Sequence, residues 1–198
     1  MRTSIETQVL DKVKRAKRGN LFFVDSFPEI NNAKAVNKAL ERLVKSGKLE
    51  RLATGIYLRP VIDDYIGKVL PGIEEIAFAI AKRDRATTIP TGSYAMYKLG
   101  LTSQVPLNIV FYSDTSARKI KIGKQTVTFK KASSRNLAFV GEISTLAIQA
   151  LRTIGKEQAT EEEVQQINKL LKNENPKHLQ HDLQLAPVWI RKLLTANE

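Results

Sequence analysis

The side chains with the clearest chemistry in this sequence form a cationic row between residues 31 and 45. At about 100° per residue they fall on one side of a helix: Asn31, Lys34, Lys38, Arg42 and Lys45. Lysine and arginine side chains bind phosphate oxygens, and amide side chains hydrogen-bond base edges. The residue types therefore predict a helix face suited to duplex DNA, whose major groove is about 12 Å wide and admits one α-helix.

The other residues of this helix must pack in a core if the cationic row is to face solvent. The aliphatic side chains gather on the opposite side of the same helix: Ala33, Val36, Leu40, Leu43 and Val44. Asn31 or Asn32 supplies an N-cap and Gly47 a C-terminal stop, so we expect a helix from Asn32 to Ser46. Taken alone, such a helix is also typical of a solvated surface, and its neighbours must decide between the two interpretations.

Two helices are expected before it. The first runs from Thr3 to Lys17, because Ile5, Val9, Val13 and Ala16 make one apolar stripe. An apolar run at residues 21–24 follows, and then Asp25 or Ser26 would cap a short second helix. The three helices appear in the order of a helix-turn-helix.

Two short strands complete the pattern. Residues 48–52 and 56–59 read as strands joined around Thr54 and Gly55, which predicts the wing of a winged helix-turn-helix domain over residues 1–60. Base contacts are expected near the N-terminus of the third helix, with backbone contacts further along it and at the wing. The predicted DNA-binding residues are Asn31, Asn32, Lys34, Ala35, Lys38, Arg42, Lys45, Arg51, Thr54 and Arg59.

The overall charge favours a polyanionic partner. The formal net charge is +12 and the pI about 9.9. DNA, RNA and an anionic membrane surface all fit this excess, and so does solubility alone. Before residue 61 lie 13 of the 32 Lys and Arg residues but only 6 of the 20 Asp and Glu residues. The positive charge is therefore densest in the predicted DNA-binding domain.

Several function classes find no support in the sequence. The absence of cysteine excludes disulfides, thiolate metal sites and a cysteine nucleophile. No P-loop, Rossmann or serine-nucleophile motif is present, so we expect no cofactor. No apolar run approaches the ~20 residues that span a bilayer, and residues 1–6 lack the apolar core of a secretory signal. We therefore expect a cytoplasmic protein with no membrane partner.

The rest of the chain predicts a second domain, which makes the fold class α+β. Residues 61–72 contain Asp63, Asp64, Pro71 and two glycines and suit a linker or docking segment. Residues 73–198 read as a mixed α/β domain with a helical C-terminus. Helices are expected near 73–85, 93–99, 143–154, 160–171, from 175 and near 189–194; a strand at 107–112 and a hairpin at 119–129 lie among them.

A second cationic cluster lies in that hairpin and just after it. It contains no acidic residue and consists of Arg118, Lys119, Lys121, Lys124, Lys130, Lys131 and Arg135. Three interpretations stay open: a second phosphate-contacting surface, a charged sheet edge that prevents strand-to-strand aggregation, and a patch for an acidic partner protein.

Two smaller constellations suggest catalytic or metal chemistry only weakly. Gly92-Ser93 is similar to the turn of nucleotidyltransferases, but those enzymes need paired carboxylates for metal-assisted phosphoryl transfer, and only Asp114 follows at a suitable place. The alternative is an N-cap at Ser93, and we expect no enzymatic activity. His178 and His181 lie three residues apart on a predicted helix, which fits either one metal-binding face or two surface histidines.

Beyond these physical arguments, the sequence resembles a known family. Asp25 and Phe27, the run from Val36 to Leu52, and the run from Gly55 to Pro60 resemble the N-terminal domain of AbiEi-type antitoxins. These proteins belong to bacterial type IV toxin–antitoxin and abortive-infection systems. The run from Thr91 to Leu101, followed by Pro106 and the strand Asn108–Phe111, is similar to the α/β domain that follows in that family.

That resemblance implies a bacterial transcriptional repressor acting on its own operon. It also implies a partner, a cognate toxin of the nucleotidyltransferase-like kind. The operator sequence and the oligomeric state stay open, and residues from Lys156 onward match no motif of the family. Two alternatives come from other classes: a nucleotidyl- or phosphoryl-transferring enzyme, and a protein-interaction adaptor built on the winged helix.

Overall fold

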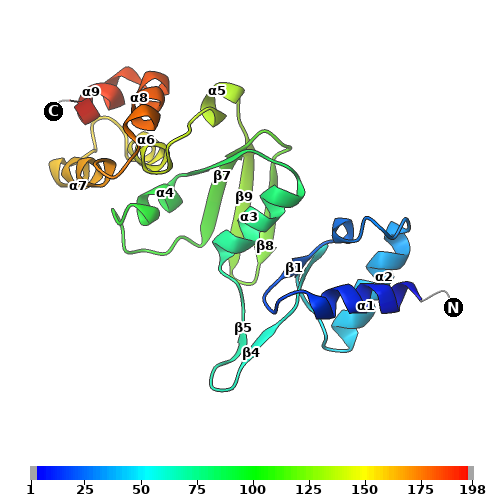
Figure 1. Cartoon of the computed structure of the whole chain (residues 1–198). Coiled ribbons are helices and arrows are strands. Elements are labelled where there is room, and N and C mark those ends of the chain that lie inside the picture. The colour runs from blue at the N-terminus through cyan, green and yellow to red at the C-terminus, as the bar shows by residue number, and fades with distance from the viewer. Residues whose placement is uncertain (1–3, 196–198) are drawn as a thin grey trace. The chain divides into compact units, whose positions relative to one another are not determined.

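Two helices that pack against each other form the centre of the N-terminal region (Figure 1). The computed structural model describes residues 4–195. Helix α1 (Ile5–Arg15) begins where the Ser4 hydroxyl accepts a hydrogen bond from the amide of Thr7. The predicted start at Thr3 lies outside the described residues. Helix α2 (Ala33–Lys45) begins at Asn32, whose side chain accepts from the amide of Ala35. Valines of α1 and aliphatic residues of α2 share one core with Phe22 and Phe27.

A small antiparallel sheet completes this domain. Strands β1 (Leu21–Phe22), β2 (Glu50–Ala53) and β3 (Ile56–Leu58) lie in the order β1-β3-β2. The element order and the sheet confirm the predicted winged helix-turn-helix. Its second helix is reduced to the 3-10 turn η1 (Val24–Ser26). Here the predicted cap is wrong, because η1 begins after Phe23 and the Ser26 hydroxyl accepts from the Phe23 amide.

The segment predicted as a linker at 61–72 holds a β-hairpin. Strands β4 (Val61–Asp63) and β5 (Gly67–Val69) pair antiparallel, and helix α3 (Ile73–Arg83) follows. The chain divides into two compact units, Met1–Arg83 and Asp84–Glu198, so the boundary comes later than expected. One reason is that Arg83 places its guanidinium 4.7 Å from the ring centre of Phe23, which attaches the end of α3 to the first unit.

The second unit is built on a four-stranded mixed sheet. Strands β6 (Thr88–Thr91), β7 (Asn108–Ser113), β8 (Arg118–Ile122) and β9 (Gln125–Lys131) lie in the order β6-β7-β9-β8. The β7–β9 pair is parallel and the others are antiparallel. Helix α4 (Ser93–Lys98) lies between β6 and β7 and packs against the first of the C-terminal helices, and the short helix α5 (Ser134–Leu137) follows β9 and leads into them. The α+β fold class is thereby confirmed.

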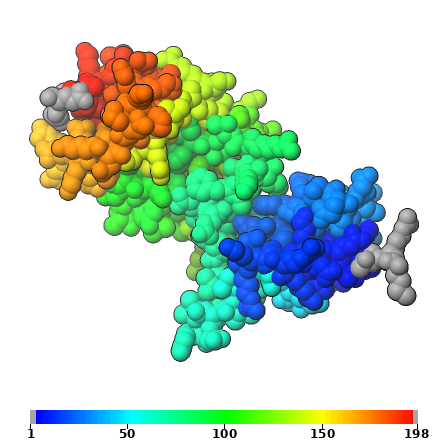
Figure 2. Space-filling view, in the orientation of Figure 1, coloured from blue at the N-terminus to red at the C-terminus, as the bar shows by residue number. Residues whose placement is uncertain are grey.

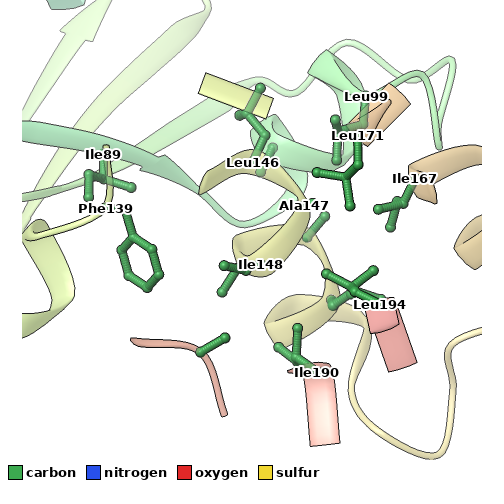
Figure 3. Packing of buried hydrophobic residues seen from close by; sticks show 14 of the residues in the cluster. Ile89, Leu99, Phe139, Leu146, Ala147, Ile148, Ile167, Leu171, Ile190 and Leu194 are labelled. Atoms are coloured by element: carbon green, nitrogen blue, oxygen red, sulfur yellow. The ribbon is translucent and has the colours of Figure 1, made fainter. Parts of the chain in front are cut away.

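The chain ends in four helices, and the last three pack around the first. They are α6 (Glu142–Ile154), α7 (Glu161–Leu171), α8 (Pro176–Leu185) and α9 (Val188–Thr195). Figure 3 shows Ala147 and Ile148 of α6 among side chains from the sheet and from α7 and α9. The predicted capping box at Thr160 and Glu163 and the N-cap at Asn175 are both present. Among the described residues, no helix combines the length and apolarity that a membrane crossing requires.

Candidate nucleic-acid interface

Helix α2 has the two-sided character that its sequence predicts. Val36, Ala39, Leu40 and Leu43 are buried. The exposed residues lie on the other side and before the helix: Asn31, Asn32, Lys34, Lys38, Arg42 and Lys45, together with Glu41. The expected inward position of Ala33 is wrong. This residue is exposed because it opens the first turn, ahead of the part of α2 that packs in the core, whereas Ala39 is buried in its place.

The lysines of this face are free to meet a ligand. Within residues 4–195, no side chain or backbone group makes a hydrogen bond or an ion pair with the ammonium groups of Lys34, Lys38 and Lys45. Positions three and four apart on a helix lie about 5–6 Å from each other at Cβ. The row therefore presents closely spaced cations along one line, which suits the phosphates of a nucleic-acid backbone.

Arg42 belongs to the same row but has a partner within the domain. Its Nη1 lies 2.8 Å from the Glu6 carboxylate of α1, and the two side chains are 65% and 42% exposed. An ion pair between groups this exposed is weak and exchangeable. A phosphate would therefore compete with Glu6 for this guanidinium, which distinguishes Arg42 from the three lysines.

Two residues that the sequence did not single out fix α2 against the sheet. The Tyr57 hydroxyl of β3 donates to the Asn37 side-chain oxygen at 3.2 Å, and the Asn37 amide donates to Glu41 at 3.0 Å. Burial raises the pKa of Tyr57, so its hydroxyl keeps the proton that it donates. In the sequence, Asn37 is an amide residue that falls between the aliphatic side and the cationic side of the predicted helix, and this position was the signal that could have indicated it.

The other residues predicted to contact DNA differ in their exposure and in their partners within the domain. Arg51 and Thr54 are exposed at the wing, 3.5 Å apart between Nη2 and Oγ1, and Ala35 is half-buried near the start of α2. The side-chain oxygen of Asn32 caps the helix, and its side-chain nitrogen is left for a ligand. For Arg59 the prediction is wrong. Its guanidinium donates to the carbonyls of Lys14 and Ala16 and so satisfies the C-terminal end of α1.

In the second unit, the cationic cluster on and after the hairpin β8–β9 also contains both exposed residues and one residue that is bound within the protein. The lysines and Arg135 are exposed: Lys119, Lys121, Lys124, Lys130, Lys131 and Arg135. Arg118 is corrected, since it forms an ion pair with Asp84 and its guanidinium lies 5.0 Å from the Phe129 ring centre. Strand β8 is an edge strand, and Lys119 and Lys121 lie on it. The exposed lysines fit all three interpretations: a phosphate-contacting surface, a charged edge that prevents strand pairing, and a patch for an acidic partner protein.

The residues considered for catalysis lie in ordinary structural surroundings. The Asp114 carboxylate accepts a hydrogen bond from the Thr87 amide at 3.1 Å. The expected N-cap at Ser93 is wrong, because Gly92 occupies that position and Ser93 is the first residue of α4. His178 and His181 are exposed, and His181 Nδ1 lies 3.0 Å from Asp182. Among the described side chains, no three from His, Cys, Asp and Glu are grouped as metal ligands.

Asp182 and Glu174 instead hold the beginning of α6. Asp182 is fully buried and accepts hydrogen bonds from the amides of Val140 and Gly141 and from the Ser144 hydroxyl. Glu174 accepts from the amides of Ile143 and Ser144. Burial alone would raise the pKa of each carboxyl, but these hydrogen bonds outweigh it and lower both pKa values. Two ionised carboxylates thus cap one helix N-terminus.

Comparison with known proteins gives a family. A family model matches residues 8–179. The chain belongs to the DUF6088 family, which is described as a family of unknown function. A comparison of this DUF6088 protein with curated proteins found no match. Among solved structures it is similar to the one described as the crystal structure of RV2827C protein from Mycobacterium tuberculosis, at 11% identity and a TM-score of 0.45, over 98% of this chain and 82% of the other.

Proposed function

We propose that this DUF6088 protein is a transcriptional regulator that binds double-stranded DNA through α2 and its wing. The observation that carries the proposal is the row of Lys34, Lys38 and Lys45 on the exposed side of α2, without partners among residues 4–195. In helix-turn-helix proteins the corresponding helix enters the major groove and its N-terminal residues contact bases. Asn31 and the side-chain nitrogen of Asn32 lie at that end, while Arg51 and Thr54 lie on the wing.

A fluorescence-anisotropy titration tests this proposal. The probe is a labelled duplex from upstream of the protein's own gene, compared with a scrambled duplex of equal length at about 50 and 200 mM salt. We expect tighter binding to the native duplex. The variant K34A/K38A/K45A should bind at least about tenfold more weakly, with a salt slope shallower by about 2 to 3, because each phosphate contact contributes about 0.9 to that slope.

A matched control separates this face from general charge. The variant K169A/K172A/K177A removes the same charge from exposed lysines of the second unit that have no partner among the described residues. It should retain most of the affinity for the native duplex. Equal weakening in both variants would contradict the assignment of α2, and equal affinity for native and scrambled duplexes would contradict sequence-specific regulation.

The resemblance to AbiEi-type antitoxins extends the proposal to a biological role. We infer that the protein represses its own operon in the cytoplasm and neutralises a nucleotidyltransferase-like toxin encoded beside it. Expression of the neighbouring open reading frame should arrest growth, and co-expression of this chain should restore it. The K34A/K38A/K45A variant should still restore growth while failing to repress a reporter fused to the operon promoter. Absence of growth arrest would exclude the antitoxin role and leave the DNA-binding proposal standing.

A further inference from the structure

The tip of the β4–β5 hairpin exposes large apolar side chains. Tyr65 is 97% exposed and Ile66 75%, and the neighbouring Ile62 of β4 is 59% exposed. Figure 2 shows the hairpin as a narrow projection of the first unit. Single exposed apolar residues are normal on protein surfaces, but contiguous ones at a projecting tip indicate a contact site.

Local interactions hold the tip in one conformation. The Asp63 side chain accepts hydrogen bonds from the amides of Tyr65 and Ile66, at 2.9 and 3.1 Å. The Lys68 ammonium lies 3.2 Å from the Glu50 carboxylate of β2, which adds a weak contact between the hairpin and the wing sheet. A two-stranded hairpin is marginally stable in water on its own. These contacts therefore preorganise an apolar tip that would otherwise fray, and preorganisation lowers the entropic cost of docking.

The tip also differs in charge from the chain that carries it. Asp63 and Asp64 flank Tyr65 and Ile66 in a protein with a net charge of +12. The nearest cation along the hairpin, Lys68, is engaged with Glu50. The tip is thus acidic and apolar at once. It is poorly suited to a phosphate backbone, and it suits an apolar surface with a cationic rim.

A groove with that chemistry lies on the second unit. Its volume is about 650 Å³, and it is lined by Val188, Trp189 and Leu193 with Lys156 and Lys192. Val188 is 63% exposed, so the apolar floor is open to a docking partner. Lys156 lies 3.8 Å from Glu157, but both side chains are mostly exposed, so this contact can exchange for another carboxylate.

We propose that the hairpin tip of one copy of this protein docks into this groove of a second copy. Tyr65 and Ile66 would pack on Trp189 and Leu193, while the aspartates approach the two lysines of the rim. A second copy is favoured over an unrelated protein because both surfaces are present on every molecule and complement each other in polarity and in charge. The inference does not depend on DNA binding.

Charge reversal on the full-length protein tests the docking without DNA. Sedimentation velocity from about 1 to 100 µM should show the wild type self-associating. The variants D63K/D64K and K156E/K192E should each self-associate about tenfold more weakly or not at all, because tip and groove then carry like charges. D63K also removes the acceptor for the Tyr65 and Ile66 amides, so K156E/K192E, which leaves the tip intact, isolates the effect of charge. Mixed in equal amounts, the two variants should associate again, since the native tip of K156E/K192E meets the native groove of D63K/D64K.

Trp189 gives a second readout, because it is the single tryptophan of the chain and lines the groove. Its emission should change with concentration in the wild type and in the mixture, but in neither charge-reversed variant alone. The control K169E/K172E changes charge elsewhere on the second unit and should associate like the wild type, and circular dichroism checks that every variant is folded. A monomeric wild type at 100 µM, or a mixture that stays monomeric, would overturn the proposal.

Discussion

Helices α2 and α6 have the same length, thirteen residues, and opposite surroundings. In α2 four residues are buried, and its N-terminus is capped by the side chain of Asn32 just before it. In α6 every residue from Ser144 to Leu151 is buried, and its N-terminus is held by carboxylates far along the chain. The difference shows which helix can serve a ligand: α2 keeps one side for a partner, whereas α6 is surrounded by its own protein.

The largest expected effect is on stability, at the capped N-terminus of the buried helix α6. Asp182→Ala removes the acceptor for Val140, Gly141 and Ser144 and leaves buried donors unsatisfied. We expect the second unit to lose about 3 kcal/mol of unfolding free energy, the scale for breaking a buried network around a charge. Urea unfolding followed by Trp189 fluorescence measures it. Asp11→Ala, at an exposed position of α1, is the control and should change stability little. A loss below about 1 kcal/mol for Asp182→Ala would mean that α6 does not need this cap.

A smaller effect should follow from acid, because protonation leaves the carboxyl groups in place. The pKa values of Asp182 and Glu174 are lowered in the folded protein. Their stabilisation is therefore fully present above the ordinary values of 3.8 and 4.5 and is lost as the pH falls through the folded values. Urea midpoints of the second unit should fall between about pH 5 and pH 2. Glu174→Gln should flatten this decline, and an unchanged slope in that variant would assign the acid sensitivity elsewhere.

The difference between the local cap of α2 and the distant cap of α6 also explains which parts of the structure the sequence predicted. The two-sided pattern of α2, the cap at Asn32 and the capping box at Thr160 depend on residues within a few positions of each other, and all three were predicted. Local periodicity and cap spacing are sufficient there, because the interacting groups are neighbours along the chain. The winged helix-turn-helix followed from the order of such locally defined elements.

What the sequence did not predict depends on partners distant along the chain. Arg59 caps α1 from more than forty residues away, and Arg118 pairs with Asp84 across 34 positions. The sequence predicts both as surface cations, because nothing in the residues beside a charged side chain indicates a distant partner. Asp182 is a third case, because the amides that it binds lie about forty residues away and nothing beside it in the sequence indicates them. The β4–β5 hairpin was missed because Asp63, Asp64 and Gly67 are equally typical of a linker.

A smaller loss of stability is expected at the N-terminus of α2. Asn32→Ala removes the acceptor for the Ala35 amide, and N-caps of this kind contribute about 1 kcal/mol. Hydrogen exchange should show faster exchange at Ala35 and in the first turn of α2, with little change in α6. Asn31→Ala, one residue earlier and outside the cap, is the matched control. If both substitutions had the same effect, the cap would not account for the stability of this helix end.

The smallest effect concerns Arg42, the one residue of the α2 row whose side chain is paired with another side chain between residues 4 and 195. Glu6→Gln should free its guanidinium and raise affinity for the native duplex about twofold, while the unfolding free energy changes by less than about 0.5 kcal/mol because the pair is exposed. Glu29→Gln removes the same charge from a carboxylate that pairs with Lys12 instead, so it measures the general effect of charge. In an Arg42→Ala background, Glu6→Gln should give only that general effect. A twofold gain that persists without Arg42 would mean that Glu6 acts as a diffuse negative charge, and that α2 meets DNA with four equivalent cations.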